Sequence, residues 1–255
     1  MKRKKYKITV LGIFFIILAV FFSIPDGKLR LIFCDVGQGD GAMIIKGNQQ
    51  ILIDAGPNNG KMGQCLDKYV PFWDKKIEGV IISHWDKDHA GGLNTIIKSY
   101  RVKNLFEAGQ SLDGIEQKVY THVLKAGDIF RYGEISFEVV FPEEMIKSDN
   151  GNSLVVVMNY LEKKFMFTGD VTSEEEGEIM RWWRGEVAGL KVAHHGSETG
   201  SSEGWLKRLS PEVAVISVGE NKYGHPSDTV LNRIRDLGVR VMRTDREGDI
   251  ILGWD

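Results

Sequence analysis

The stretch Ser83-His84-Trp85-Asp86-Lys87-Asp88-His89-Ala90-Gly91-Gly92 decides which fold and chemistry we expect of this chain. It follows the apolar run Gly79-Val80-Ile81-Ile82, which is typical of a strand buried on both faces. Two imidazoles and two carboxylates then lie within six residues. Imidazole nitrogen and carboxylate oxygen bind zinc and harder divalent ions, so the stretch predicts a metal site. The alternative is a solvated turn with Asp88 as a helix cap, but a cap needs only one of these four side chains.

Carboxylates also close two earlier segments. Asp54 ends an apolar strand expected at 50–54, and Asp40 ends the turn Gly37-Gln38-Gly39-Asp40 between strands expected at 29–36 and 42–46. The glycines of this turn suit a backbone that passes close to another part of the chain, although an ordinary hairpin is an alternative. A helix over 62–73 is expected to lead back to the central strand.

Later strands end in polar residues as well. The strand expected at 164–168 precedes Asp170, which either projects into a site or caps a helix over 173–184. His194 and His195 follow a strand at 190–193. Adjacent side chains on an extended chain point to opposite sides, so we expect only one of them, His195, to bind metal. His225 precedes a helix expected at 228–237 and is either a helix-entry residue or a site group.

The rest of the chain carries no visible chemistry. Strands are expected at 104–108, 128–130, 135–140, 154–158 and 213–217, and 240–244 and 249–252 are expected to be edge strands. His122 stands alone, and we interpret it as a surface or strand histidine. Because strands and helices alternate throughout, the pattern predicts one α/β domain with helices covering sheets.

The motifs together resemble the metal-binding signatures of the metallo-β-lactamase superfamily. The signature His-x-His-x-Asp-His matches residues 84–89 with Asp86 in place of the second histidine, as in the branch typified by the hydrolase domain of ComEC-type competence proteins. The resemblance covers almost everything after residue 28, and it implies an αββα sandwich of two mixed sheets with helices outside. The further matching motifs are Asp35-Val36-Gly37-Gln38-Gly39-Asp40, Leu52-Ile53-Asp54-Ala55-Gly56, Phe167-Thr168-Gly169-Asp170, Lys191-Val192-Ala193-His194-His195-Gly196-Ser197 and Tyr223-Gly224-His225-Pro226.

The resemblance also implies roles for individual residues. Two divalent metal ions, zinc or manganese, would be held by six side chains, among which Asp170 would bridge the two ions. The expected metal ligands are His84, Asp86, Asp88, His89, Asp170 and His195. Residues expected to take part in catalysis are Asp88, His194 and His225. Residues expected to orient the ligands or to contact substrate are Asp40, Asp54, Asn152 and Ser153, the last two in a loop that supplies a third histidine in other members.

Composition excludes several classes of protein. With 255 residues, 42% hydrophobic and 27% charged, the chain can bury a sizeable core and is neither disordered nor a coiled coil. The formal net charge of -2 provides no overall attraction to nucleic acid or to an anionic membrane. Cys34 and Cys65 fit neither a zinc ribbon nor a disulfide-rich scaffold, and we expect two buried thiols rather than a disulfide.

The amino terminus predicts a membrane segment. Met1-Lys2-Arg3-Lys4-Lys5 precedes a run from Ile8 to Ile24, 17 residues without a charge. No small-x-small cleavage site is clear, so we expect an uncleaved anchor rather than a cleaved signal peptide. Either alternative divides the chain into a basic, apolar segment at 1–28 and a hydrolase domain at 29–255 on the extracytoplasmic side, membrane-anchored or secreted.

These expectations lead to a functional hypothesis. A metal-dependent hydrolase would cleave a phosphodiester by attack of a metal-activated water, and the resemblance implies DNA outside the cell as substrate. We expect the chain to lack the polytopic channel domain of ComEC-type proteins, so a role in DNA uptake does not follow directly. Alternatives are a cell-wall phosphodiesterase acting on teichoic acid or phosphorylcholine, and a non-catalytic binding module that retains the fold. No stable protein partner can be inferred.

Overall fold

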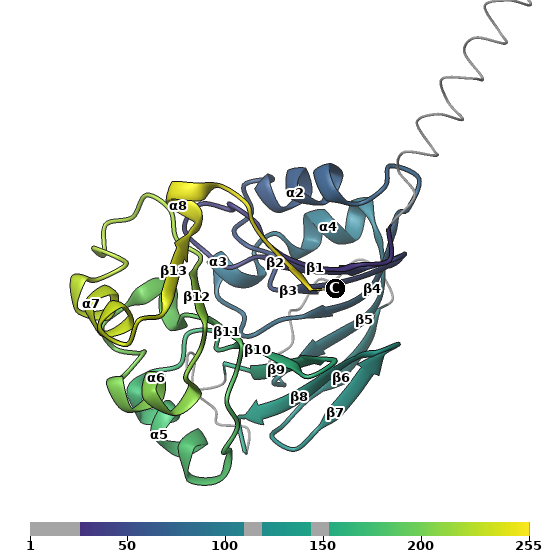
Figure 1. The fold of residues 1–255 in the computed structure, drawn as a ribbon. Coiled ribbons are helices and arrows are strands. Elements are labelled where there is room, and N and C mark those ends of the chain that lie inside the picture. Colours follow the sequence, from purple (N-terminus) through teal and green to yellow (C-terminus); the bar gives the residue numbers. More distant parts are fainter. Residues whose placement is uncertain (1–25, 110–118, 144–152, 255) are drawn as a thin grey trace, which may run out of the picture.

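Two seven-stranded mixed sheets pack face to face in the computed structural model, which describes residues 26–109, 119–143 and 153–254 (Figure 1). The first sheet has the strand order β14-β1-β2-β3-β4-β5-β6. Its strands are β1 (Leu29–Phe33), β2 (Ala42–Lys46), β3 (Gln49–Ile53), β4 (Lys76–Ile81), β5 (Arg101–Glu107), β6 (Tyr120–Val123) and β14 (Ile250–Trp254). The second sheet has the order β13-β12-β11-β10-β9-β8-β7. Its strands are β7 (Ile129–Tyr132), β8 (Ile135–Phe141), β9 (Val155–Tyr160), β10 (Lys163–Phe167), β11 (Gly189–Lys191), β12 (Val213–Ile216) and β13 (Arg240–Arg243).

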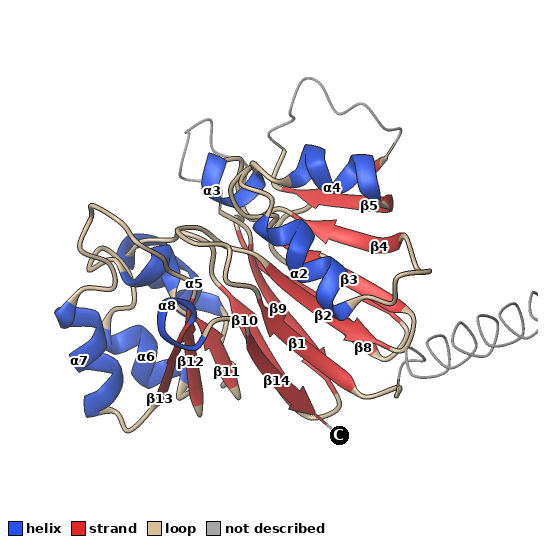
Figure 2. Ribbon diagram, turned by 90° about the horizontal axis from the view of Figure 1, so that it is seen from above, coloured by secondary structure: helices blue, strands red, loops and turns tan. Residues whose placement is uncertain are grey.

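Helices cover the outer face of each sheet (Figure 2). The first sheet is covered by α2 (Lys61–Tyr69) and α4 (Leu93–Ser99), and the second by α5 (Ser173–Trp182), α6 (Glu203–Leu209) and α7 (Asp228–Asp236). Short helices α3 (Lys87–Ala90) and α8 (Thr244–Glu247) follow β4 and β13. The expected αββα sandwich is therefore confirmed.

Alternation along the strands explains the layers. On β1, Leu31 and Phe33 lie in the core between the sheets, whereas Ile32 lies in the core beneath α2 and α4. Successive side chains of a strand point to opposite faces, so a strand buried on both faces must be apolar at every position. This is the property that made the run before Ser83 conspicuous.

The parallel half of each sheet positions the site. Strands β3, β4, β5 and β6 are parallel, as are β10, β11, β12 and β13. Their carboxyl ends therefore meet along one edge of the sandwich, where connecting loops bring polar side chains together. The loops after β3, β4, β10, β11 and β12 carry most of the residues singled out above.

Some elements differ from expectation, whereas the two predicted edge strands are confirmed. The helix expected at 62–73 ends at Tyr69, because Pro71 disfavours helical geometry at Val70, which is extended. Helix α6 was not expected at all. The prediction that the closing segments form edge strands is confirmed, since β13 ends the second sheet and β14 ends the first.

Cys34 and Cys65 form a disulfide, with Cα atoms 6.0 Å apart, so the expectation of two thiols is wrong. Cys34 directly follows β1, and Cys65 lies on the buried face of α2, which packs against the same side of the sheet. Helix packing brings the two residues together, and neither their spacing nor their neighbours in sequence signalled this.

Two expectations fall outside the described residues. The apolar run at 8–24 and Asn152 both belong to the parts of the chain that the structure leaves undescribed. Among the helices in the described ranges, none has the length and apolar character needed to cross a bilayer.

Candidate metal centre

Asp170 lies at the centre of a ring of histidines. Its Oδ1 is 3.3 Å from Nε2 of His89. Its Oδ2 is 3.8 Å from Nε2 of His84, 3.7 Å from that of His194 and 3.8 Å from that of His195. The alternative role as a helix cap is excluded, because Thr172 caps α5 with its own side chain. One carboxylate thus faces four imidazoles that come from both sheets.

The loop after β4 supplies the opposite side of this ring. His84 lies in the loop that follows β4, and its Nε2 is 3.7 Å from Oδ2 of Asp86. Helix α3 then carries Asp88, whose Oδ2 is 3.2 Å from Nε2 of His195, and the fully buried His89. Three groups of potential ligand atoms, each within 4.8 Å, share His89. The first comprises His84, His89 and Asp170, the second Asp88, His89 and His195, and the third Asp40, Asp54 and His89.

The outer nitrogens of these imidazoles are held by other groups. Nδ1 of His89 lies 3.0 Å from Oδ2 of Asp54, and Nδ1 of His195 lies 3.0 Å from the backbone oxygen of Ser217. Both oxygens are acceptors, so each histidine donates from Nδ1 and turns its Nε2 toward the centre. Asp54 also accepts from the backbone and the hydroxyl of Ser83, at 2.7 Å each. This supports the orienting role expected for Asp54.

Ser153 joins the loop after β4 to the loop after β10. Its hydroxyl lies 3.3 Å from Nδ1 of His84 and accepts from the backbone nitrogen of Asp170 at 3.2 Å. Ser153 is buried, so these contacts fix the position of both side chains.

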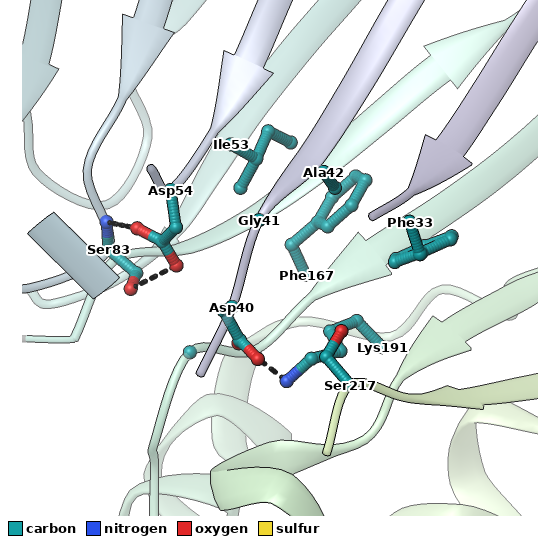
Figure 3. Close-up of a pocket in the computed structure, with 11 residues that line it drawn as sticks. Phe33, Asp40, Gly41, Ala42, Ile53, Asp54, Ser83, Phe167, Lys191 and Ser217 are labelled. Atoms are coloured by element: carbon teal, nitrogen blue, oxygen red, sulfur yellow. Dashed lines mark hydrogen bonds and ion pairs between the residues drawn. The ribbon is translucent and has the colours of Figure 1, made fainter. Parts of the chain in front are cut away.

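Asp40 lies behind the histidines and forms a buried ion pair. Nζ of Lys191 is 2.6 Å from its Oδ2, and Nδ1 of His195 is 3.2 Å from its Oδ1. Figure 3 shows Asp40 pointing toward Lys191 and Asp54 toward Ser83 around a small cavity of about 10 Å³. That is room for at most one water molecule.

Close backbone approach explains the glycine-rich turn before Asp40. A Cβ on Gly39 would lie 2.3 Å from the backbone oxygen of Asp88, and Gly39 has a φ of +139°. The nitrogen of Asp40 donates to that same oxygen at 3.0 Å. The turn therefore passes against the loop that carries the potential ligands, as the glycines suggested, and only glycine fits there.

The reasoning that separated His194 from His195 is wrong. These residues do not continue β11 as an extended chain, because both adopt left-handed backbone angles, with φ of 48° and 55°. The turn rotates both rings toward Asp170, so both Nε2 atoms approach one oxygen. His195 is buried, whereas the His194 side chain is 37% exposed at the mouth of the site.

His225 lies beside His194 and not among the carboxylates. The two ring centroids are 5.7 Å apart. Asn221 holds this loop by accepting from the backbone nitrogens of Tyr223 and His225, at 3.0 Å each. The structure thus brings His225 to the rim of the site.

Burial and charge shift the pKa values of the central groups. Desolvation and the neighbouring His89 lower the pKa of His84. Desolvation would also lower the pKa of His195, but carboxylates, with Asp40 the strongest, raise it to about 9. Desolvation would raise the pKa of Asp170, but the histidines around it, His89 above all, hold it well below its ordinary range. Asp170 is therefore ionised at neutral pH.

The residues present fit divalent metal ions. Nε2 of His89 and Oδ1 of Asp170 are buried, and neither has a hydrogen-bond partner in the described part of the chain. Burying polar atoms without partners is unfavourable, so two such atoms facing each other indicate a ligand that both would bind. Imidazole nitrogen and carboxylate oxygen are suitable donors for zinc, manganese or iron.

Lys191, Ser83 and Ser217 belong to the site but received no role from the sequence. Lys191 is 3% exposed and lies on β11, where every neighbour is apolar. A lysine in a strand buried on both faces must be paired, so its position was an available signal for a buried carboxylate. The two serines carried no comparable signal.

Curated relatives match most of this chain, which spans about a third of their length. ComE operon protein 3 of Bacillus subtilis is 30% identical over 88% of this chain and 33% of the relative. Recombination protein 2 of Haemophilus influenzae is 30% identical over 85% of this chain and 28% of the relative. Competence protein ComA of Neisseria gonorrhoeae is 27% identical over 91% of this chain and 33% of the relative.

Comparison of folds and of family patterns gives the same classification. The metallo-β-lactamase fold protein YhfI from Bacillus subtilis superposes with a TM-score of 0.62 at 12% identity, covering 89% of this chain and all of YhfI. The family model described as the metallo-β-lactamase superfamily matches residues 34–220, which include every potential metal ligand named above. The chain therefore belongs to the metallo-β-lactamase superfamily, whose members are in general metal-dependent hydrolases.

Proposed function

We propose that this protein is a metal-dependent phosphodiesterase that cleaves DNA on the extracytoplasmic side of a membrane. The observation that carries the proposal is the position of Asp170, whose two carboxylate oxygens face Nε2 of four histidines within 3.8 Å. One carboxylate among so many nitrogen donors suits a bridge between two cations, because its charge offsets their repulsion.

Each side chain has a proposed task in holding metal. His84 and Asp86 would hold one ion, Asp88 and His89 the other, with Asp170 between them and His195 completing the set. When bound, the ions would supply Lewis acidity to polarise a phosphoryl oxygen and activate water. Asp54 and the backbone oxygen of Ser217 accept from Nδ1 of His89 and His195, and Ser153 contacts Nδ1 of His84. These contacts keep the histidines in one orientation, so no reorganisation is needed when substrate arrives.

The exposed side of the site would contact substrate. His194 is partly exposed, and its ring adjoins His225 at the mouth. Nδ1 atoms of both rings are buried without a hydrogen-bond partner among the described residues. We propose that these two imidazoles contact the phosphate, and that Asp88, which is 37% exposed beside His195, orients the attacking water.

The names of relatives favour DNA over other phosphodiesters. Competence and recombination, the words in two of those names, both concern DNA. Because those relatives are much longer, their function reaches this chain only as a proposal. A cell-wall phosphodiester is the alternative that the experiment below must separate.

The disulfide supports the proposed location. Disulfides persist in oxidising compartments and are rare in the cytosol, so the Cys34–Cys65 bond agrees with delivery across the membrane. The basic residues before the apolar run at 8–24 favour the same orientation.

The proposal is tested on the full chain in detergent, stripped of metal and then given zinc or manganese. Substrates are plasmid DNA, single-stranded DNA and bis(p-nitrophenyl) phosphate. We expect metal-dependent cleavage of DNA that Asp88→Asn abolishes, while Asp236→Asn, at an exposed position on α7, leaves activity unchanged.

Other outcomes identify other functions. Cleavage of the small diester without cleavage of DNA would contradict the nuclease proposal and favour a cell-wall substrate. Absence of metal-dependent turnover of any substrate, with metal still bound, would favour a non-catalytic binding module.

A further inference from the structure

The end of the sandwich opposite the metal centre, which we call the far end, gathers the starts of several strands. Leu29 at the start of β1 pairs with Lys46 and with Trp254, and Lys76 at the start of β4 pairs with Arg101 at the start of β5. The site lies where these parallel strands finish, so the far end faces away from it. Figures 1 and 2 place the loop between α2 and β4 on the side of the molecule away from α3.

Large apolar side chains are exposed at the far end. Phe72 and Trp73, adjacent in the loop between α2 and β4, are 62% and 42% exposed. Leu161, in the turn between β9 and β10, is 67% exposed. Glu134, in the turn before β8, forms an ion pair with Lys46, so β8 begins at the far end. Because β8 and β9 are antiparallel, β9 finishes at that end, and the turn with Leu161 lies there too. Single exposed hydrophobic residues are common, whereas two adjacent aromatics with a leucine on one end indicate a surface that contacts something apolar.

Exposed basic side chains accompany these residues, and one of them, Lys75, also forms an ion pair with Asp67 at 3.3 Å. Lys75 follows the two aromatics, and its backbone oxygen accepts from the nitrogen of Arg101 at 2.7 Å. Lys28 precedes β1 at the same end. Tryptophan beside lysine and arginine is the composition found where membrane proteins meet the lipid headgroups.

The apolar run at 8–24 ends shortly before β1 in the sequence. Only four residues lie between Ile24 and Leu29, and five fully extended residue steps reach about 17 Å. Three strand spacings, about 14 Å, separate β1 from β4, whose preceding loop carries Phe72 and Trp73. A bilayer that holds the run at 8–24 would therefore lie within reach of the exposed aromatics.

We propose that the far end rests on the outer leaflet of the membrane, with Phe72 and Trp73 in the headgroup region and the metal centre facing the aqueous side. This inference rests on the proposed membrane location but not on the proposed hydrolytic activity. It identifies a lipid surface as the partner of the far end. It also fixes the orientation of the site, which would receive substrate from outside.

The test uses the full chain reconstituted in vesicles of equal parts phosphatidylcholine and phosphatidylglycerol, with either ordinary or brominated acyl chains. Bromine quenches tryptophan fluorescence at short range. Subtracting the emission of Trp73→Phe from that of the wild type isolates Trp73 from the other five tryptophans. We expect this difference emission to be blue-shifted and to fall at least twofold in brominated vesicles.

A matched control places a tryptophan near the site. Tyr223 is 75% exposed on the loop that carries His225, so Tyr223→Trp in the Trp73→Phe background should give emission that brominated lipid leaves unchanged. Equal quenching at both positions, or none at position 73, would overturn the proposed orientation. Failure of the chain to float with vesicles would overturn the membrane location as well, and neither result bears on hydrolysis, which is measured separately.

Discussion

The two sheets contribute to the metal centre in different ways. The first supplies His84, Asp86, Asp88 and His89 from one loop and one short helix, so their spacing alone predicted a metal site. The second supplies Asp170, His194 and His195 from two loops, each after a short buried strand. A contiguous motif can be recognised in the sequence. Ligands that are scattered along the chain form a site only because parallel strands align the loops that carry them.

Removing the contribution of the second sheet should have the largest effect. Asp170→Asn keeps the shape but loses the charge that faces four histidines, so we expect about a 10³-fold or greater loss of kcat on bis(p-nitrophenyl) phosphate. Metal content, measured by mass spectrometry, should fall with it. Asp86→Asn in the first sheet, with a side chain 47% exposed, should lose less. Equal losses in the two variants would contradict the central role of Asp170.

The ion pair between Asp40 and Lys191 links the two sheets behind the metal centre, and a substitution can remove it. Lys191→Met leaves Asp40 buried without its partner, so we expect a loss of about 3–5 kcal/mol in the free energy of unfolding, measured with urea. Metal affinity should fall about 10–100-fold, because Asp40 also faces His195.

A second substitution provides the control for this pair. Adding Asp40→Asn removes the unpaired charge and should recover part of the lost stability without restoring metal affinity. If the double variant is no more stable than Lys191→Met, the ion pair is not what holds the sheets together here.

The first sheet alone carries a covalent link, which permits a separate test. The disulfide closes a loop of 31 residues, and replacing both cysteines by alanine should lower the free energy of unfolding by about 3–4 kcal/mol. Dithiothreitol should shift the urea midpoint of the wild type to that of the double variant and leave the variant itself unchanged. A urea midpoint that does not change with dithiothreitol would show that the disulfide does not contribute to the free energy of unfolding.

The smallest expected effect concerns the hydrogen bond between Trp85 and Glu107 at the first sheet. Burial raises the pKa of Glu107 to about 7, and Trp85 donates to its Oε2 at 2.7 Å. The folded form holds the proton to higher pH than the unfolded chain, so stability should fall as pH rises from the ordinary value of 4.5 to about 7. Glu107→Gln should match the wild type at pH 4 and exceed its Tm by about 2–4 °C at pH 8. Parallel Tm curves over this range would refute the shift.

The same contrast explains what the sequence could and could not predict. The layers of the fold followed from apolar strands and from the resemblance, and the edge positions of β13 and β14 were anticipated. The turn at His194 and His195 was not, because two non-glycine residues with positive φ leave no local signal. Lys191 was overlooked although a lysine on a buried strand implies a buried partner, and the identity of that partner, Asp40, depended on how the two sheets pack. The pairing of Cys34 with Cys65 likewise depended on helix packing.

The pairing of β1 with β14 has a consequence for folding during synthesis. About 220 residues separate the two strands, and ribosomes add about 5–20 residues per second. The synthesis of β14 therefore follows that of β1 by roughly 10–45 s. During that time the outer edge of β1 exposes unpaired backbone groups, which can pair with other nascent chains. The fifteen residues 240–254, which carry both β13 and β14, complete the two sheets almost simultaneously. Assembly of the sandwich is therefore timed by the synthesis of β13 and β14, and factors that shield nascent chains would act on the domain until these strands are made.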